Sequence, residues 1–219
     1  MNMVIPAVNW SAIGPELILS LTAMGLLLLN VLAKKGAKGA IAYLSLAGIV
    51  LALIFCFSLW GKSEYAFNRM VVVDNYSLFF KIVFLITAAL TVLMSIRFLQ
   101  EEEFEYGEYY ILVLFAAVGM MFMASAADLI IIFLGLETFS LAIYVLAGFF
   151  RTQPKSNESS LKYFLLGAFS TGFLLYGIAL IYGATGTTNL KGIYEFVRKI
   201  HLLTDPLLLI GMGLLIVGF

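Results

Sequence analysis

Residues 128–150 read DLIIIFLGLETFSLAIYVLAGFF. This run begins with Asp128, and Glu137 is the only other carboxylate in it. As a helix rising 1.5 Å per residue, this run is roughly 33 Å long, about the thickness of a bilayer's hydrocarbon core. The sequence therefore predicts a transmembrane helix. Glu137 lies about 13 Å along the helix axis from Asp128 and about 20 Å from Phe150, so the helix places an acid near the middle of the bilayer.

An ionisable side chain at that depth is costly, since insertion scales assign about 2.5–3.5 kcal/mol to a comparable charge. Such residues face a protein interior or a wet cavity, and they mark proton or ion pathways. Ser140, Tyr144 and Gly148 continue one stripe from Glu137 at helical spacing. We predict a proton pathway that contains Glu137, with Ser140 and Tyr144 as weaker members. The alternative is a protonated acid that only makes structural hydrogen bonds.

The composition is that of a membrane protein. Of 219 residues, 63% are hydrophobic and 12% are charged, and the mean hydropathy is +1.04, whereas a soluble domain carries about 25% charged residues. Thirteen basic and thirteen acidic residues cancel, so nothing indicates a nucleic-acid partner. Cys56 is the only cysteine, which excludes an internal disulfide and a cysteine-ligated cluster. The sequence holds no motif of a catalytic, cofactor or metal site, and it favours transport over catalysis.

Apolar segments recur along the whole chain, each near the length of about 20 residues that crosses a bilayer. We expect an all-α, polytopic transmembrane bundle in a single membrane domain, residues 1–219. The expected spans are about 15–33, 40–60, 76–98, 109–127, 128–150, 161–185 and an incomplete seventh at 206–219. Because the seventh reaches only about 20 Å before the last residue, we expect the sequence to be the front part of a longer protein.

Basic residues in the connections predict the orientation. One set of alternate connections carries Lys34, Lys35, Lys38, Arg97, Arg151 and Lys155, and the opposite set carries Lys62, Arg69, Lys191, Arg198 and Lys199. The bias is modest, but the short first connection is strongly basic. We therefore assign the first set to the cytoplasm and the N-terminus to the outside.

Two lysines lie within the expected spans. Lys162 is about one and a half turns inside the sixth span. From periodicity alone, it fits two interpretations equally well: a member of a proton path, or a lysine whose side chain reaches back to the membrane interface. Lys81 in the third span is interpreted as such a snorkelling lysine. Gly135, two residues before Glu137, would let a neighbouring backbone approach the acid. Ala168/Gly172 and Ala179/Gly183 form pairs of small residues suited to close helix packing.

Two long motifs together resemble the antiporter-like membrane subunits of respiratory complex I. They are LIIIFLGLETFSLAIYVLAGF and, after a short loop, ESSLKYFLLGAFSTGFLLYGIALIYGATGT. The resemblance implies a fourteen-helix subunit of two inverted five-helix repeats, of which this chain holds the first. It implies that Glu137 pairs with a lysine of the seventh helix and that Lys162 belongs to the proton path. The seventh-helix lysine, its Pro-Phe-His-x-Trp pattern and the second repeat are absent from this sequence.

The same resemblance implies a proton-translocating subunit of NADH:quinone oxidoreductase in a bacterial inner membrane. NADH, FMN, iron–sulfur clusters and quinone would then be bound by partner subunits, and the partners of this chain would be other membrane-arm subunits and the lipid bilayer. Two alternatives stay open. One is a subunit of a cation/proton antiporter or of a membrane-bound hydrogenase. The other is a structural membrane scaffold.

Overall fold

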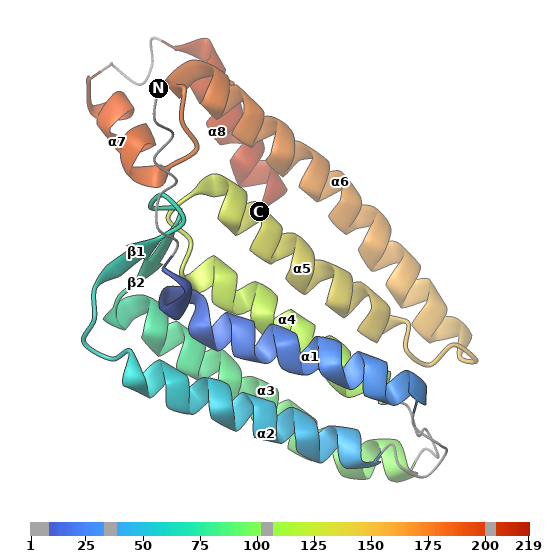
Figure 1. The fold of residues 1–219 in the computed structure, drawn as a ribbon. Coiled ribbons are helices and arrows are strands. Elements are labelled where there is room, and N and C mark those ends of the chain that lie inside the picture. Colours follow the sequence, from blue (N-terminus) through green and yellow to red (C-terminus); the bar gives the residue numbers. More distant parts are fainter. Residues whose placement is uncertain (1–8, 33–38, 102–106, 200–204) are drawn as a thin grey trace.

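The chain folds as an all-helical bundle in the computed structural model, which describes residues 9–32, 39–101, 107–199 and 205–219 (Figure 1). The predicted fold class is confirmed. In chain order the elements are η1 Trp10–Ile13, α1 Gly14–Leu32, α2 Gly39–Ser58, β1 Glu64–Ala66, β2 Val71–Val73, α3 Asn75–Glu101, α4 Glu108–Ala124, α5 Leu129–Ala147, α6 Pro154–Thr185, α7 Leu190–Lys199 and α8 Pro206–Gly218.

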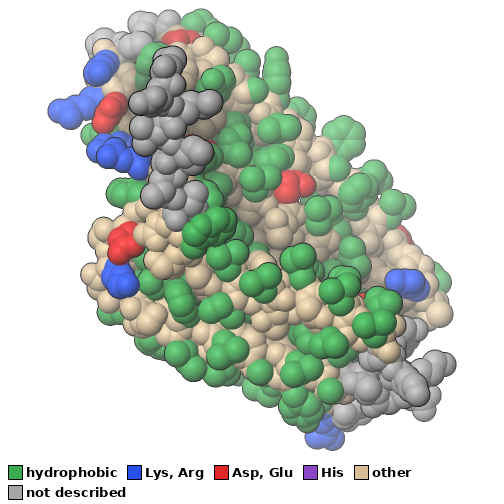
Figure 2. Space-filling view, in the orientation of Figure 1, with side chains coloured by type: hydrophobic (Ala, Val, Ile, Leu, Met, Phe, Trp, Pro, Cys, Tyr) green, Lys and Arg blue, Asp and Glu red, His purple; other side chains and the backbone are tan. Residues whose placement is uncertain are grey.

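Most of these helices are built to cross a membrane. Five helices of the described chain are long and apolar enough to span it, namely α1 with η1, α2, α3, α5 and α6. The apolar helices α4 and α8 are shorter, at 17 and 13 residues. Figure 2 shows hydrophobic side chains over the flanks of the helices, with charged groups mostly toward the two ends of the bundle. This distribution matches a chain embedded in lipid.

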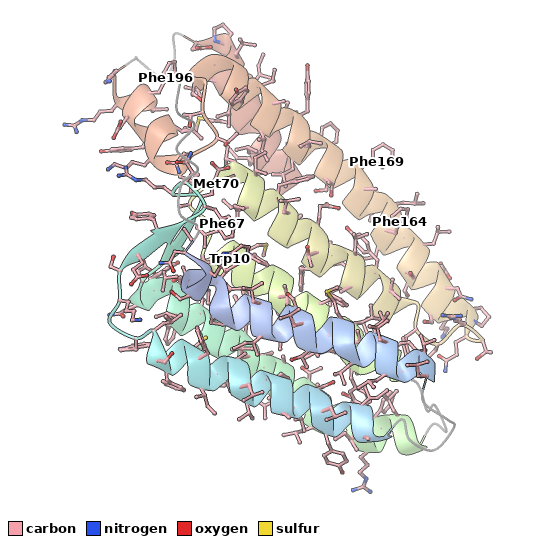
Figure 3. The ribbon with its side chains drawn as sticks, viewed as in Figure 1. Trp10, Phe67, Met70, Phe164, Phe169 and Phe196 are labelled. Atoms are coloured by element: carbon pink, nitrogen blue, oxygen red, sulfur yellow. The ribbon has the colours of Figure 1, made fainter. Side chains whose placement is uncertain are left out.

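The helices form two groups joined by α5. Helices α1 to α4 enclose the larger apolar core, and α5, α6 and α8 enclose a smaller one around Leu129, Leu174, Ile178, Ile181 and Leu208. In Figure 1, α5 lies between α4 on one side and the α6–α8 pair on the other. Phe169 of α6 is exposed and points away from both cores (Figure 3). Phe164, which is also partly exposed, packs edge-on against Tyr144 of α5 with the ring centroids 5.7 Å apart. The helix that carries Glu137 is therefore the central element.

Glycines allow the closest helix crossings. A Cβ built at Gly119 of α4 would lie 2.6 Å from the Gly135 carbonyl oxygen of α5, and a Cβ at Gly135 would lie 2.8 Å from the Gly119 carbonyl oxygen. A neighbouring backbone, that of α4, does approach α5 at Gly135, whereas Glu137 faces α6, so its approach to the acid stays a prediction. The small-residue pairs expected in α6 do not pack in this way, because a Cβ at Gly172 or Gly183 would meet no described atom within 4 Å. Gly177 of α6 makes the close crossing to α8 instead.

Helix boundaries follow local capping chemistry. Asp128 caps α5 by accepting from the Ile130 amide at 2.9 Å. Helix α6 begins at Pro154, seven residues before the expected span, because proline is favoured in a first turn and the polar residues that follow continue the helix outside the apolar stretch. Gly186 ends α6 with a φ of 71°, a left-handed conformation suited to glycine.

One end of the bundle, which we call the hairpin end, is held together by short extended segments. Strands β1 and β2 pair antiparallel, and Trp10 of η1 packs edge-on against Phe67 of their turn at a ring distance of 6.0 Å (Figure 3). The α4–α5 connection lies between β2 and the α6–α7 connection: the Val72 amide donates to the Ser125 carbonyl at 2.8 Å, and the Leu129 amide donates to the Thr188 carbonyl at 2.9 Å. This hairpin was not predicted from the sequence.

Candidate functional site

Glu137 lies in the middle of α5 and faces α6. The Thr171 hydroxyl of α6 donates to Glu137 Oε1 at 2.7 Å. The carboxylate is partly buried, and among the described residues it makes no ion pair. The site is therefore a single carboxylate that a hydroxyl of the neighbouring helix holds by a hydrogen bond.

Ser140 and Tyr144 extend this region toward the C-terminal end of α5, and both are buried. Tyr144 packs on α6, with its ring 4.9 Å from that of Tyr163 and its hydroxyl so close to Gly167 that a Cβ there would have no room. Its carbonyl also accepts from the Ser160 hydroxyl at 2.8 Å. Glu137 and Tyr144 therefore both face α6, and their role in proton transfer remains a prediction.

Lys162 does not reach Glu137. It lies nine residues before Thr171 on α6, which is about 13 Å along the helix. Its side chain is 69% exposed and forms an ion pair with Glu158, one turn earlier. The described chain thus leaves Lys162 on an open face of α6, apart from the acid.

A second ionisable site was missed by the sequence analysis. Lys81 Nζ of α3 lies 2.6 Å from Glu16 Oε1 of α1, and both side chains are 0% exposed. The Ser125 hydroxyl, at the end of α4, donates to the same Glu16 oxygen at 3.4 Å. Apart from this ion pair, Lys81 Nζ has no hydrogen-bond partner within the described part of the chain, and Glu16 Oε2 has none. The interpretation of Lys81 as a snorkelling lysine is therefore wrong, because an acid on a neighbouring helix binds it inside the bundle.

A signal for this pair was present in the sequence. The first and third spans of an alternating bundle begin at the same face, and Glu16 and Lys81 each lie within two turns of the start of their helices. An acid and a base at similar depth on two such helices are candidates for pairing. Each residue was considered alone, so the pairing was not predicted.

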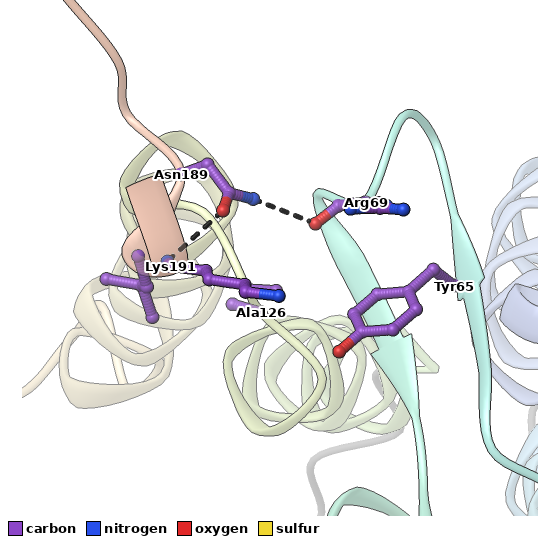
Figure 4. Close-up of a pocket in the computed structure, with 7 residues that line it drawn as sticks. Tyr65, Arg69, Ala126, Asn189 and Lys191 are labelled. Atoms are coloured by element: carbon purple, nitrogen blue, oxygen red, sulfur yellow. Dashed lines mark hydrogen bonds between the residues drawn. The ribbon is translucent and has the colours of Figure 1, made fainter. Parts of the chain in front are cut away.

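The hairpin end also carries a pocket of about 370 Å³. Its lining includes Tyr65 and Arg69 of the hairpin, Ala126 of the α4–α5 connection, and Asn189 and Lys191 at the start of α7 (Figure 4). The Asn189 side-chain amide donates to the Arg69 carbonyl at 3.0 Å, and the Lys191 amide donates to Asn189 Oδ1 at 3.1 Å. The pocket has two basic side chains and lies beyond the apolar helices.

Known proteins match both the sequence and the fold. A family model described as "NADH:quinone oxidoreductase/Mrp antiporter, TM" matches residues 126–219. The NADH-quinone oxidoreductase subunit N of Trichlorobacter lovleyi is 52% identical over 97% of this chain and 44% of its own length. Subunit N 2 of Roseiflexus castenholzii is 41% identical over 100% of this chain and 44% of its own length.

Solved structures share the fold of this chain. A chain of respiratory complex I from Thermus thermophilus with bound aureothin has a TM-score of 0.73 and 34% identity, covering 93% of this chain and 42% of that one. The chain is thus similar in sequence and fold to subunit N of NADH-quinone oxidoreductase and to a chain of respiratory complex I. An archaeal membrane-bound sulfane sulfur reductase shares the fold, with a TM-score of 0.76 and 21% identity over 94% of this chain and 43% of that one. The chain spans about 44% of the length of these subunit N relatives.

Proposed function

We propose that this chain forms the first half of a proton-translocating subunit of an NADH:quinone oxidoreductase and that Glu137 carries the proton. The observation that supports the proposal most is a titratable acid in the middle of a membrane helix, hydrogen-bonded to Thr171 of the next helix. Intramembrane acids of this kind mark proton relays. The 52% identity to a subunit named for that oxidoreductase supports the same assignment.

The chemistry of this site is the reversible protonation of one carboxylate. A cation brought near Glu137 would favour the ionised form and release its proton, and withdrawal of that cation would favour uptake. The Thr171 hydroxyl donates to this carboxylate from α6. The cationic partner is assigned to a part of the full-length subunit outside this sequence.

Lys162 is proposed as a further member of the path. Ion pairing with Glu158 keeps its ammonium on the face of α6. In the full-length subunit, other helices that cover this face would bury the lysine and place it within a relay. Ser140 and Tyr144 line the α5 side of the same region.

The oxidation of NADH and the reduction of quinone are assigned to partner subunits, which would bind NADH, FMN, iron–sulfur clusters and quinone. The chain would lie in a bacterial plasma membrane, with the hairpin end and the N-terminus outside. The connection at Arg151 would then face the cytoplasm. The basic residues Lys34, Lys35 and Lys38, on which this orientation chiefly depends, lie outside the described residues.

A second candidate is a cation/proton antiporter or a related ion-translocating complex, because the matching family model covers both kinds of protein. Purification of the native complex through a tag on the full-length subunit separates the two. We expect NADH-dependent quinone reduction in the purified complex and NADH-driven proton translocation in vesicles without added sodium. Absence of NADH oxidation, or translocation that requires sodium, would favour the antiporter.

A further inference from the structure

The buried pair of Glu16 and Lys81 lies in the α1–α4 group, apart from Glu137. We propose that Glu16 and Lys81 form a second proton-binding site, which serves the same proton path as Glu137 from the hairpin end. This inference rests on the proposed function of the subunit.

Burial is the first argument for a functional pair. Both side chains are fully enclosed among apolar residues of α1 to α4. Replacing a buried ion pair by apolar side chains of similar volume is often neutral or stabilising, so stability alone gives little reason for such a pair. Ionisable residues inside a membrane bundle are instead characteristic of proton and ion pathways.

The second argument is an unused acceptor. Glu16 Oε1 contacts Lys81 and Ser125, whereas the buried Glu16 Oε2 has no hydrogen bond within the described chain. A proton from water at the hairpin end would bind to Oε2 and convert the carboxylate to a neutral acid, while Lys81 stays an ammonium. The net charge of the pair would change from zero to +1, and return of the proton to water or to the next carrier would reverse the change.

The third argument is depth. Glu16 is the third residue of α1 and Lys81 is the seventh of α3, so their backbones lie about 3 Å and 9 Å from helix starts at the hairpin end. Counted along the helix axes, the starts of α1 and α3 are within one or two helical turns of the pair. Glu137, eight residues into α5, is about 12 Å from the same end. The pair thus lies nearer to this surface than Glu137 does.

Helix α4 connects the two sites. Ser125, which donates to Glu16, follows Met123 by two residues. The Met123 amide nitrogen would lie 3.0 Å from a Cβ at Gly135, and Glu137 follows Gly135 by two residues. A change of charge at the pair therefore acts one helix crossing away from Glu137.

The test uses the full-length subunit in its assembled complex and measures NADH-driven proton translocation per complex in membrane vesicles. The variant is the double substitution Glu16→Gln with Lys81→Met, alone and combined with Glu137→Gln. We expect the double variant to lose at least twofold in translocation while the amount of assembled complex stays unchanged. Because both sites serve one path, the combined variant should translocate no more slowly than Glu137→Gln alone. The control Asn30→Leu removes another buried polar group of α1 whose Oδ1 has no partner in the described chain, and it should translocate normally.

Wild-type translocation in the double variant, with Glu137→Gln defective, would overturn the second site and leave the proposed function intact. Normal translocation in Glu137→Gln would contradict the proposed function and with it the shared path. If the double variant does not assemble, Glu16→Gln with Lys81→Gln keeps a polar, neutral pair. Assembly of this variant with reduced translocation supports the site, whereas full translocation, or a second failure to assemble, overturns it.

Discussion

At the scale of single residues, the hydrogen bond from Thr171 ties the proposed proton carrier Glu137 to α6. Hydrogen bonds to charged groups contribute about 1.5–3 kcal/mol. Thr171→Val keeps the shape of the side chain but removes the donor, so we expect slower NADH-driven proton translocation and a smaller loss than in Glu137→Gln. Thr171→Ser restores the hydroxyl and should recover most of the rate. A valine variant equal to wild type would show that this bond has no part in proton transfer.

Lys162 allows a second test at this scale. Its exposed ion pair with Glu158 is of the i, i+4 kind, which contributes only about 0.3–0.5 kcal/mol. Lys162→Met should therefore leave the level of assembled complex unchanged while lowering proton translocation. Glu158→Gln breaks the same ion pair and serves as the control, with translocation expected to stay normal. Equal translocation in both variants would remove Lys162 from the path.

The sequence predicted one of the two ionisable sites. Glu137 could be found because the depth of an acid follows from counting residues along a single apolar run. Glu16 and Lys81 could not be found in this way, because their ion pair joins two helices and the two residues are 65 positions apart in the chain. Snorkelling is the ordinary behaviour of a lysine near a helix end, and only the position of Glu16 shows that Lys81 does otherwise.

At the scale of elements, the crossing of α4 and α5 fixes the position of the helix that carries Glu137. A Cβ at Gly135 would meet the backbone of α4, whereas a Cβ at Gly172 would meet nothing described within 4 Å. Gly135→Ala should lower the amount of assembled complex several-fold, because a helix backbone must shift to accept the methyl group. Gly172→Ala should leave it unchanged. Immunoblotting of native gels measures both variants, and equal levels would contradict the role given to this crossing.

Helices were far easier to predict than the extended segments. An apolar run of about 20 residues indicates a membrane helix regardless of its neighbours. Strands β1 and β2 have three residues each, and their pairing depends on a turn in which Phe67, Asn68 and Arg69 adopt positive φ values of 49°, 54° and 66°. Such conformations are uncommon for residues other than glycine. The sequence around them therefore gave no signal of a hairpin.

At the scale of the whole molecule, the hairpin, α7 and the α4–α5 connection lie at one end of the bundle (Figure 1). The connection between α5 and α6 lies at the other end. With the N-terminus outside, the hairpin end must face the outside as well. The orientation can therefore be tested at either end of the described chain.

Cysteine labelling provides this test. Cys56 is buried and should give little background. The two ends are reported by single cysteines at the exposed positions Ser63, in the α2–β1 connection, and Thr152, in the α5–α6 connection. A membrane-impermeant maleimide added to intact cells should label the Ser63→Cys variant and spare the Thr152→Cys variant. The reverse pattern would invert the topology.

The central claim is that Glu137 carries a proton and does not merely pack. Glu137→Gln keeps the shape and hydrogen bonding but cannot titrate, whereas Glu137→Asp keeps the titration with a shorter reach. A purely structural acid predicts the opposite order, because glutamine forms similar hydrogen bonds and avoids the cost of a buried charge.

The most direct measurement is NADH-driven proton translocation per assembled complex in vesicles that contain either variant of the full-length subunit. The account predicts a severe loss in the glutamine variant, partial activity in the aspartate variant and normal amounts of complex in both. Near-wild-type translocation in the glutamine variant, at normal levels of complex, would contradict it.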